Sequence, residues 1–177
     1  MFGSYLCWKC SNPANEEEYL MGSPVRLKIY DVIKDMSLMD FFGLGVYHTT
    51  VEVFDKEYTF GASDDSFEGI KCYPAGYLDS IDIPYTFRET MLIGYTLYDE
   101  AQVDEIIRFM QRDYTSQSYD IILHNCNHFT QDFIKVLCNR NIPKYINRLA
   151  SIVSSNSFFH KIARSIYDGR PPLDPNI

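Results

Sequence analysis

The residues best suited to chemistry in this sequence are a cysteine and its polar neighbours, His124-Asn125-Cys126-Asn127-His128. The stretch 123–138 predicts a helix, because apolar residues share one side with Cys126 at helical spacing, namely Phe129, Phe133 and Leu137, together with Thr130. Cys126 then falls in the first turn, where the helix dipole and free backbone N–H groups favour the reactive thiolate. We therefore expect Cys126 to be a nucleophile.

Asn125 stands directly before this cysteine and allows two interpretations. In acyl transfer the tetrahedral oxyanion needs hydrogen-bond donors, and the backbone N–H of Cys126 is the obvious first donor. The side-chain N–H of Asn125 is a candidate second donor. Asparagine is also a preferred N-cap residue, so the same side chain can instead cap the helix.

A cysteine nucleophile needs a base, and the sequence offers four histidines. His128 lies about 200° around the predicted helix from Cys126, so its ring points away from the sulfur. His124 belongs to an extended lead-in whose side chains alternate in direction, and His160 lies in an amphipathic C-terminal segment. His48 is favoured, because it stands on the more polar face near the start of a predicted strand, where a rigid scaffold can aim its ring.

The elements that must position this pair are strands followed by helices. Apolar periodicity predicts strands at 25–33, 46–54, 57–61 and 85–95, with a turn at Asp55-Lys56 between the second and third. The first strand is expected to have one buried face, because Val25, Leu27 and Ile29 alternate with Arg26, Lys28 and Tyr30. Asp99 and Gln102 have the spacing of a capping box and predict a helix with a buried stripe of Val103, Ile106, Ile107 and Met110. We also expect a short strand or extended lead-in at 119–123 and helices after Pro143 and at 158–167. This order predicts one α+β domain.

Two loops are expected to form the rim of the site. Residues 36–45 carry apolar side chains, and 62–82 is turn-rich with acidic residues at Asp64, Asp65 and Glu68. Long connections in compact domains are more often functional than idle. Residues 1–24 are expected to be a peripheral segment and 168–177 a flexible tail.

Composition limits the classes of function. The formal net charge is −8, which leaves no basic surface for a nucleic acid. The five cysteines form no disulfide framework, and Cys7 and Cys10 find no second pair to complete a zinc site. No apolar run reaches 18 residues, so no integral membrane segment is expected. We expect an intracellular protein, cytoplasmic and also nuclear, without a metal or cofactor.

These residues carry a resemblance to a known family. Gly45-Val46-Tyr47-His48-Thr49, Glu57-Tyr58-Thr59-Phe60-Gly61 and His124-Asn125-Cys126-Asn127-His128-Phe129 resemble motifs of the PPPDE cysteine peptidases, also called desumoylating isopeptidases. The resemblance covers roughly residues 25–150. It implies a permuted papain-like fold, a small antiparallel sheet or barrel packed against helices, with the catalytic domain at 25–167.

The resemblance also implies a function. His48 and Cys126 are the positions that match the His–Cys dyad of the family. The expected substrates are proteins conjugated to ubiquitin-like modifiers through isopeptide bonds, SUMO first and ubiquitin second, cleaved through an acyl-enzyme. The resemblance leaves room for a homodimer.

Two other functions stay open at this point. The same dyad can serve a protein thioesterase that removes palmitoyl groups, with an apolar channel walled by Met39, Phe41 and Phe42. A metal-binding or interaction module would use His124, Cys126, His128 and Cys138, although the two cysteines do not join the histidines at helical spacing.

Overall fold

A single antiparallel sheet organises the protein. The computed structural model describes residues 22–32, 46–63, 66–81 and 85–148. Its strands are β1 (Ser23–Asp31), β2 (Tyr47–Val53), β3 (Lys56–Phe60), β4 (Ile70–Pro74) and β5 (Thr86–Thr96). They pair in the order β4-β3-β2-β1-β5, and every neighbouring pair is antiparallel. Helices α3 (Tyr77–Ser80), α4 (Glu100–Met110) and α5 (Cys126–Cys138) complete the α+β class that the sequence predicts.

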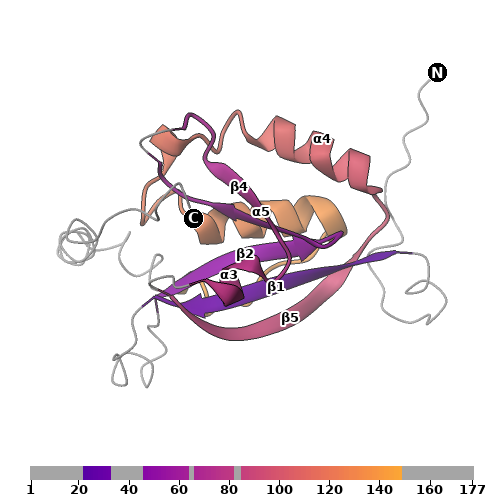
Figure 1. The fold of residues 1–177 in the computed structure, drawn as a ribbon, viewed down its shortest axis with the longest axis horizontal. Helices are drawn as coiled ribbons and strands as arrows, with labels where there is room; N and C mark the ends of the chain where they lie inside the picture. The colour runs from indigo at the N-terminus through magenta and orange to yellow at the C-terminus, as the bar shows by residue number, and fades with distance from the viewer. Residues whose placement is uncertain (1–21, 33–45, 64–65, 82–84, 149–177) are drawn as a thin grey trace.

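Helix α5 packs against one face of the sheet and forms the core with it (Figure 1). The alternating residues Val25, Leu27 and Ile29 of β1 have 0% exposure. They meet a helix side that is also fully buried, including Phe129, Phe133 and Ile134 at 0% exposure. The apolar side predicted for the cysteine helix is therefore confirmed, and it fixes the rotation of α5 about its axis.

The opposite face of the sheet is buried as well, which the alternation in β1 did not predict. Lys28 and Tyr30, expected on an open face, are 3% and 1% exposed. The Lys28 ammonium lies 3.0 Å from Glu57 of β3 and 2.7 Å from Asp79 of α3. The Tyr30 hydroxyl donates to the same two carboxylates. A short helix and a set of polar bonds thus cover this face.

The hairpin between β2 and β3 turns one residue earlier than expected. Phe54 and Asp55 have φ of 52° and 56°, so these two residues, rather than Asp55-Lys56, form the centre of the turn. Two consecutive positive φ values are typical of a type I′ turn, which matches the twist of the flanking strands. The turn sets the register Val53↔Lys56, Glu52↔Glu57 and Val51↔Tyr58.

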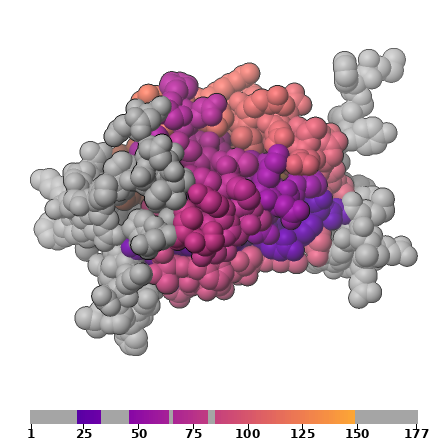
Figure 2. All heavy atoms as spheres, viewed as in Figure 1, coloured from indigo at the N-terminus to yellow at the C-terminus, as the bar shows by residue number. Residues whose placement is uncertain are grey.

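The segment 62–82 contains more regular structure than the predicted loop. It includes β4 and α3, and the space-filling view shows this magenta segment across the front of the molecule (Figure 2). Asp64 and Asp65 of the predicted acidic rim lie outside the described residues, and Glu68 is exposed.

The remaining helices agree with the sequence in part. The capping box of Asp99 and Gln102 is present at the start of α4, and Val103 and Met110 are buried. After the short 3-10 helix η2 (Ser116–Ser118), the expected strand or extended lead-in at 119–123 is instead a turn at 121–123, closed by a single β-bridge between Asp120 and His124. Helix α5 ends before the left-handed Asn139, and 144–147 are turns. Most of the predicted peripheral segment 1–24 lies outside the described residues, as do the predicted loop 36–45, the predicted helix 158–167 and the predicted tail 168–177. Within the described part, no helix is both long enough and apolar enough to cross a membrane.

Candidate active site

The start of α5 is fixed by Asn125. Its Oδ1 accepts hydrogen bonds from the backbone N–H groups of Asn127 at 3.0 Å and His128 at 3.3 Å. In return, the backbone N–H of Asn125 donates to Nδ1 of His128 at 3.2 Å, which completes a capping box. The Nδ2 group donates to the carbonyl of Ile121 at 2.7 Å. The N-cap role is therefore the one seen, and a role for Nδ2 at the oxyanion would require release from Ile121.

The sulfur of Cys126 is buried, with 4% of the residue exposed. Burial raises the pKa of the thiol to about 11, because a thiolate would lose its hydration. Hydrogen bonds lower the pKa in part, from the backbone of Thr49, Asn127 and Cys126 itself and from the Tyr119 side chain. The expected stabilisation by the helix start is present, but the expectation of a thiolate is wrong for the free protein, since desolvation outweighs it.

His48 lies in β2 with its side chain on the polar face, as predicted. Its Nε2 is 3.0 Å from Oγ1 of Thr59, a residue of β3. The ring of Tyr85 stacks on the imidazole, with centroids 4.7 Å apart and planes at 18°. His48 is 6% exposed, and burial lowers its pKa to about 4. The imidazole is therefore neutral at physiological pH and able to accept a proton.

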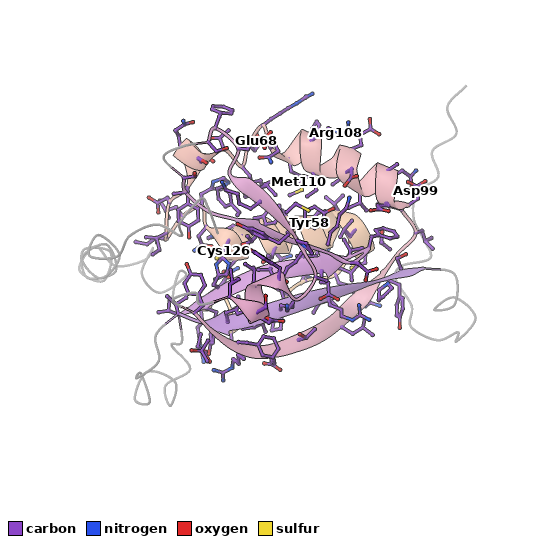
Figure 3. The ribbon with its side chains drawn as sticks, in the orientation of Figure 1. Tyr58, Glu68, Asp99, Arg108, Met110 and Cys126 are labelled. Carbon is purple, nitrogen blue, oxygen red and sulfur yellow. The ribbon has the colours of Figure 1, made fainter. Side chains whose placement is uncertain are left out.

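Asn127 ties the helix start to the strand segment around His48. Its Nδ2 donates to the backbone carbonyl of Tyr47 at 3.2 Å, and its Oδ1 accepts from the hydroxyl of Thr49 at 2.8 Å. The residues on both sides of His48 are thus bonded to the residue that follows Cys126. These bonds hold the first turn of α5, where Cys126 lies (Figure 3), beside the segment of β2 that carries His48.

The side chains of His48 and Thr49 lie on opposite faces of β2. Thr49 faces α5, and by strand alternation His48 faces away from it. The pairing of β2 with β3 extends from Val53 only to Val51, and beyond it the side chains of His48 and Thr59 are in contact through Nε2 and Oγ1. Among the hydrogen bonds of the described residues, none joins Cys126 to His48; Sγ instead contacts Oδ1 of Asn127 at 3.6 Å.

The other histidines of the described part have different partners. Nδ1 of His124 is bonded to the carbonyl of Ser118 at 3.0 Å, and its ring stacks on Tyr114. His128 serves the capping box, in agreement with its predicted direction away from the sulfur. Within the described ranges, no three His, Cys, Asp or Glu residues are grouped so that they could hold a metal ion. His160 lies outside these ranges.

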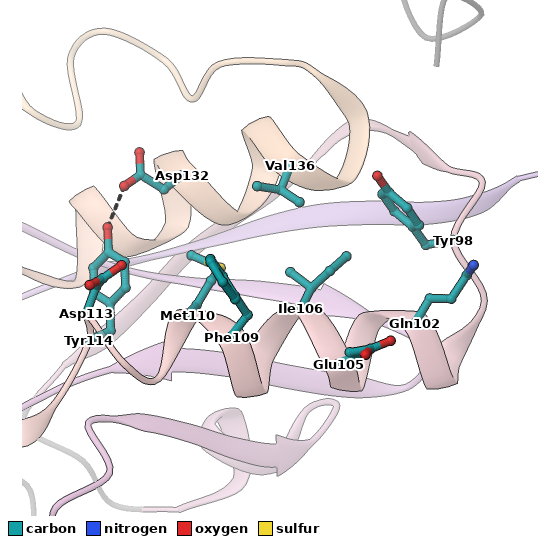
Figure 4. Close-up of a pocket in the computed structure, with 10 residues that line it drawn as sticks. All are labelled: Tyr98, Gln102, Glu105, Ile106, Phe109, Met110, Asp113, Tyr114, Asp132 and Val136. Atoms are coloured by element: carbon teal, nitrogen blue, oxygen red, sulfur yellow. Dashed lines mark hydrogen bonds between the residues drawn. The ribbon is translucent and has the colours of Figure 1, made fainter. Parts of the chain in front are cut away.

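A separate hollow lies between α4 and α5. Its volume is about 580 Å³, and its lining includes Ile106, Phe109, Met110 and Val136 (Figure 4). Tyr114 donates to Asp132 at 2.6 Å at one end of it. Neither Cys126 nor His48 lines this hollow, so it is distinct from the candidate site.

Sequence reasoning did not identify three residues of the site: Thr59, Tyr119 and Asn127. Thr59 had a signal in the sequence, because period two places it on the same face of its strand as Glu57. Glu57 pairs with Glu52, which belongs to the polar face of β2. Asn127 bonds to Thr49 and Tyr47, which are 78 and 80 residues away, and Tyr119 reaches Cys126 from the end of η2, so no periodic pattern marks either residue.

Comparison with known proteins gives consistent matches. The family described as the PPPDE putative peptidase domain matches residues 23–166. The desumoylating isopeptidase 1 homolog of Caenorhabditis elegans is 29% identical over 137 residues, which cover 77% of this chain and 41% of that protein. A DeSI-like protein of Arabidopsis thaliana is 30% identical over 133 residues, covering 75% of this chain and 57% of the relative.

A third relative matches over more of its own length. Desumoylating isopeptidase 1 of Rattus norvegicus is 28% identical over 146 residues, covering 76% of this chain and 79% of that protein. The chain therefore spans about half the length of the first two relatives and most of the third.

Proposed function

We propose, since this chain belongs to the PPPDE putative peptidase family, that it is a cysteine isopeptidase with Cys126 as nucleophile and His48 as base. The observation that carries the proposal is the bonding of Asn127 to both neighbours of His48, which places the start of the nucleophile helix against the strand of the base. The substrates would be proteins joined to SUMO, and secondly to ubiquitin, through isopeptide bonds to lysine.

The chemistry is acyl transfer in two steps. The Cys126 thiol gives its proton to His48 as the sulfur attacks the carbonyl carbon at the end of the modifier. The imidazolium then protonates the leaving lysine amine, and a thioester joins the modifier to Cys126. His48 next takes a proton from water, the hydroxide attacks the thioester, and the thiolate leaves and regains the proton from the imidazolium.

The backbone N–H of Cys126 remains the first candidate oxyanion donor, since it lies at the start of α5, where backbone donors have no partner within the helix. The Tyr119 hydroxyl is a second candidate, because it reaches the same sulfur. Asn125 is the weaker choice, because its Nδ2 is held by Ile121.

The free protein represents a resting state of this dyad. Burial raises the pKa of Cys126 to about 11 and lowers that of His48 to about 4, so the proton stays on the sulfur. Attack requires a change in these environments, and a polar substrate carbonyl that enters the site would supply polar contacts in place of apolar ones. We therefore expect substrate binding to activate the dyad.

The names of the relatives support the choice of substrate. The Caenorhabditis elegans and rat proteins carry desumoylating isopeptidase in their names, which makes SUMO the first modifier to test. The residues proposed for a thioesterase channel, Met39, Phe41 and Phe42, lie outside the described part of the chain. A thioesterase is therefore treated as an outcome of the test.

The test is covalent labelling by probes with an electrophile at the modifier C-terminus. Wild-type protein should form an adduct with a SUMO propargylamide probe, located on Cys126 by tandem mass spectrometry. Cys126→Ser should form none, and His48→Ala should react far more slowly. Cys138→Ser is a matched control, because this buried thiol lies at the other end of α5 and its loss should leave labelling unchanged.

Two outcomes would contradict the proposal. An adduct with neither the SUMO probe nor the ubiquitin probe would exclude the isopeptidase. Turnover of a fluorogenic acyl thioester under the same conditions, lost in Cys126→Ser, would identify a thioesterase instead.

A further inference from the structure

The imidazole of His48 has two nitrogens, and only one can exchange a proton with Cys126. The ring of Tyr85 stacks on the imidazole with centroids 4.7 Å apart. The ring of Tyr30 has its centroid 6.2 Å from that of the imidazole, and the two planes are tilted by 49°. Such packing holds the plane of the ring. It does not select between the two orientations related by a 180° rotation about Cβ–Cγ, because they have nearly the same shape.

The hydroxyl of Thr59 makes that selection. Its Oγ1 is 3.0 Å from Nε2 of His48, and Thr59 is 3% exposed. The backbone of Thr59 is fixed by pairing with Lys71 of β4, so the hydroxyl is presented from a rigid strand. Rotating the ring by 180° would place a C–H group against Oγ1 and leave a buried hydroxyl without this bond.

We propose that Thr59 is the positioning residue of the dyad: it accepts a hydrogen bond from Nε2–H and leaves Nδ1 as the nitrogen that takes the proton of Cys126. This inference rests on the proposed function, since it assumes that His48 is the base. The proton balance is simple. Nε2 keeps its hydrogen throughout the reaction. Nδ1 gains the thiol proton when the sulfur attacks, and it then gives this proton to the leaving amine.

The bond to Thr59 should strengthen during the reaction. A hydrogen bond from a charged donor is about twice as strong as one between neutral groups. The imidazolium that forms when Nδ1 gains a proton is such a donor, and the hydroxyl oxygen has lone pairs to accept from it. Thr59 therefore supports the charged ring as well as its orientation.

Two substitutions separate the hydroxyl from the shape of the side chain. Thr59→Ser keeps the hydroxyl, whereas Thr59→Val replaces it with a methyl group of similar size. We expect Thr59→Val to lower kcat for cleavage of a SUMO conjugate about tenfold, because one charge-assisted hydrogen bond is lost. KM should stay nearly unchanged and Thr59→Ser should stay within about twofold of wild type. Thermal unfolding of all three proteins controls for stability.

The second reading is the rate of alkylation of Cys126 by a SUMO vinyl-sulfone probe, which occupies the site as a substrate would, followed by mass spectrometry of the Cys126 peptide. His48→Gln should slow this reaction, and Thr59→Val should slow it about tenfold where Thr59→Ser does not. If His48→Gln has no effect, the dyad and the proposed function fail. If His48→Gln slows alkylation and Thr59→Val does not, the dyad stands and the role of Thr59 is wrong.

Nuclear magnetic resonance tests the same inference on the unmodified protein. Long-range proton–nitrogen correlation of the imidazole rings reports which nitrogen carries hydrogen, and the His48 signals are those that disappear in His48→Gln. We expect the Nε2–H form at neutral pH. Observation of the Nδ1–H form would overturn the assignment of Nδ1 as the proton acceptor, whether or not the variants fold.

Discussion

At the scale of single residues, the sulfur of Cys126 is controlled by two opposing effects. Removal from water raises the pKa of the thiol, and hydrogen bonds from three backbone groups and from Tyr119 lower it. The helix start alone does not produce a thiolate in the free protein. Reactivity therefore depends on the donors that remain around the sulfur once a substrate has entered.

The contribution of Tyr119 can be measured directly. We predict that Tyr119→Phe raises the pKa of Cys126 further and slows its alkylation at fixed pH by about fivefold, since one hydrogen bond contributes about 1 kcal/mol. The rate is read by mass spectrometry of the Cys126 peptide over time. Tyr114→Phe is the matched control, because its hydroxyl is bonded to Asp132 instead. Equal rates for wild type and Tyr119→Phe, or equal slowing in both variants, would contradict this role.

The residue scale also shows what the sequence could predict of the site. The sequence indicated Cys126 by its place in the first turn of an amphipathic helix. It excluded His128 as the base, because the His128 side chain points away from the sulfur. Period two places Thr59 on the polar face of its strand, but its contact with His48 could not be predicted, because that contact depends on the register of a hairpin whose turn is Phe54-Asp55. A shift of one residue in that register would place Thr59 on the other face.

At the scale of elements, the face of the sheet opposite α5 depends on a buried polar network. Glu57, with 0% exposure, accepts hydrogen bonds from Lys28, Tyr30 and Thr50. Burial lowers the pKa of Lys28, but its bonds to Asp79 and Glu57 outweigh this effect and raise the pKa overall. Lys28 therefore stays charged and joins β1, β3 and α3.

This network predicts a large difference between two cations of β1. Lys28→Met leaves Glu57 buried without its cation and should lower the free energy of unfolding by about 3–5 kcal/mol. Arg26→Met breaks a pair with Glu52 that is partly exposed, and it should cost about 1 kcal/mol or less. Urea unfolding gives both values. Similar losses in the two variants would contradict a structural role for the buried network.

The sequence identified most elements but not what covers them. The alternation in β1 and the capping box before α4 were sufficient to predict those two elements. The match to the PPPDE family confirms the family resemblance inferred from the motifs around His48 and Cys126. Alternation in β1 also suggested an open polar face. That prediction was wrong because Lys28 and Tyr30 are covered by α3, whose four residues are too short to produce a periodic signal.

At the scale of the whole molecule, both members of the proposed dyad, Cys126 and His48, are buried in the free protein, at 4% and 6% exposure. The chain has a net charge of −8, so a modifier with a basic face would be attracted to it over a distance of about 10 Å at moderate salt. Attraction brings the partner close, and entry of its C-terminal tail would then change the environment of the dyad.

The buried neutral imidazole makes stability depend on pH. The pKa of His48 is about 4 in the folded protein, against 6.5 for the free side chain. Between these values the unfolded chain binds more protons, so the free energy of unfolding falls as the pH is lowered from about 6.5 toward 4. We predict that this residue alone accounts for a loss of up to about 3 kcal/mol.

Urea unfolding of wild type and His48→Gln at several pH values between 7 and 4.5 measures that contribution. Because the substitution itself changes the absolute free energy of unfolding, the quantity compared is its slope with pH. The slope should be smaller in His48→Gln. Equal slopes in both proteins would mean that the imidazole is not held in its neutral form by burial.

The central claim is that Cys126 and His48 together hydrolyse an isopeptide bond. Its most direct test is kcat/KM for release of a lysine peptide from a SUMO conjugate, followed by mass spectrometry of the products. We predict that wild-type protein releases both products and that Cys126→Ser and His48→Gln each lower kcat/KM by about 1,000-fold or more. Wild-type protein that leaves the conjugate intact, or a His48→Gln variant that cleaves it at the wild-type rate, would contradict the claim.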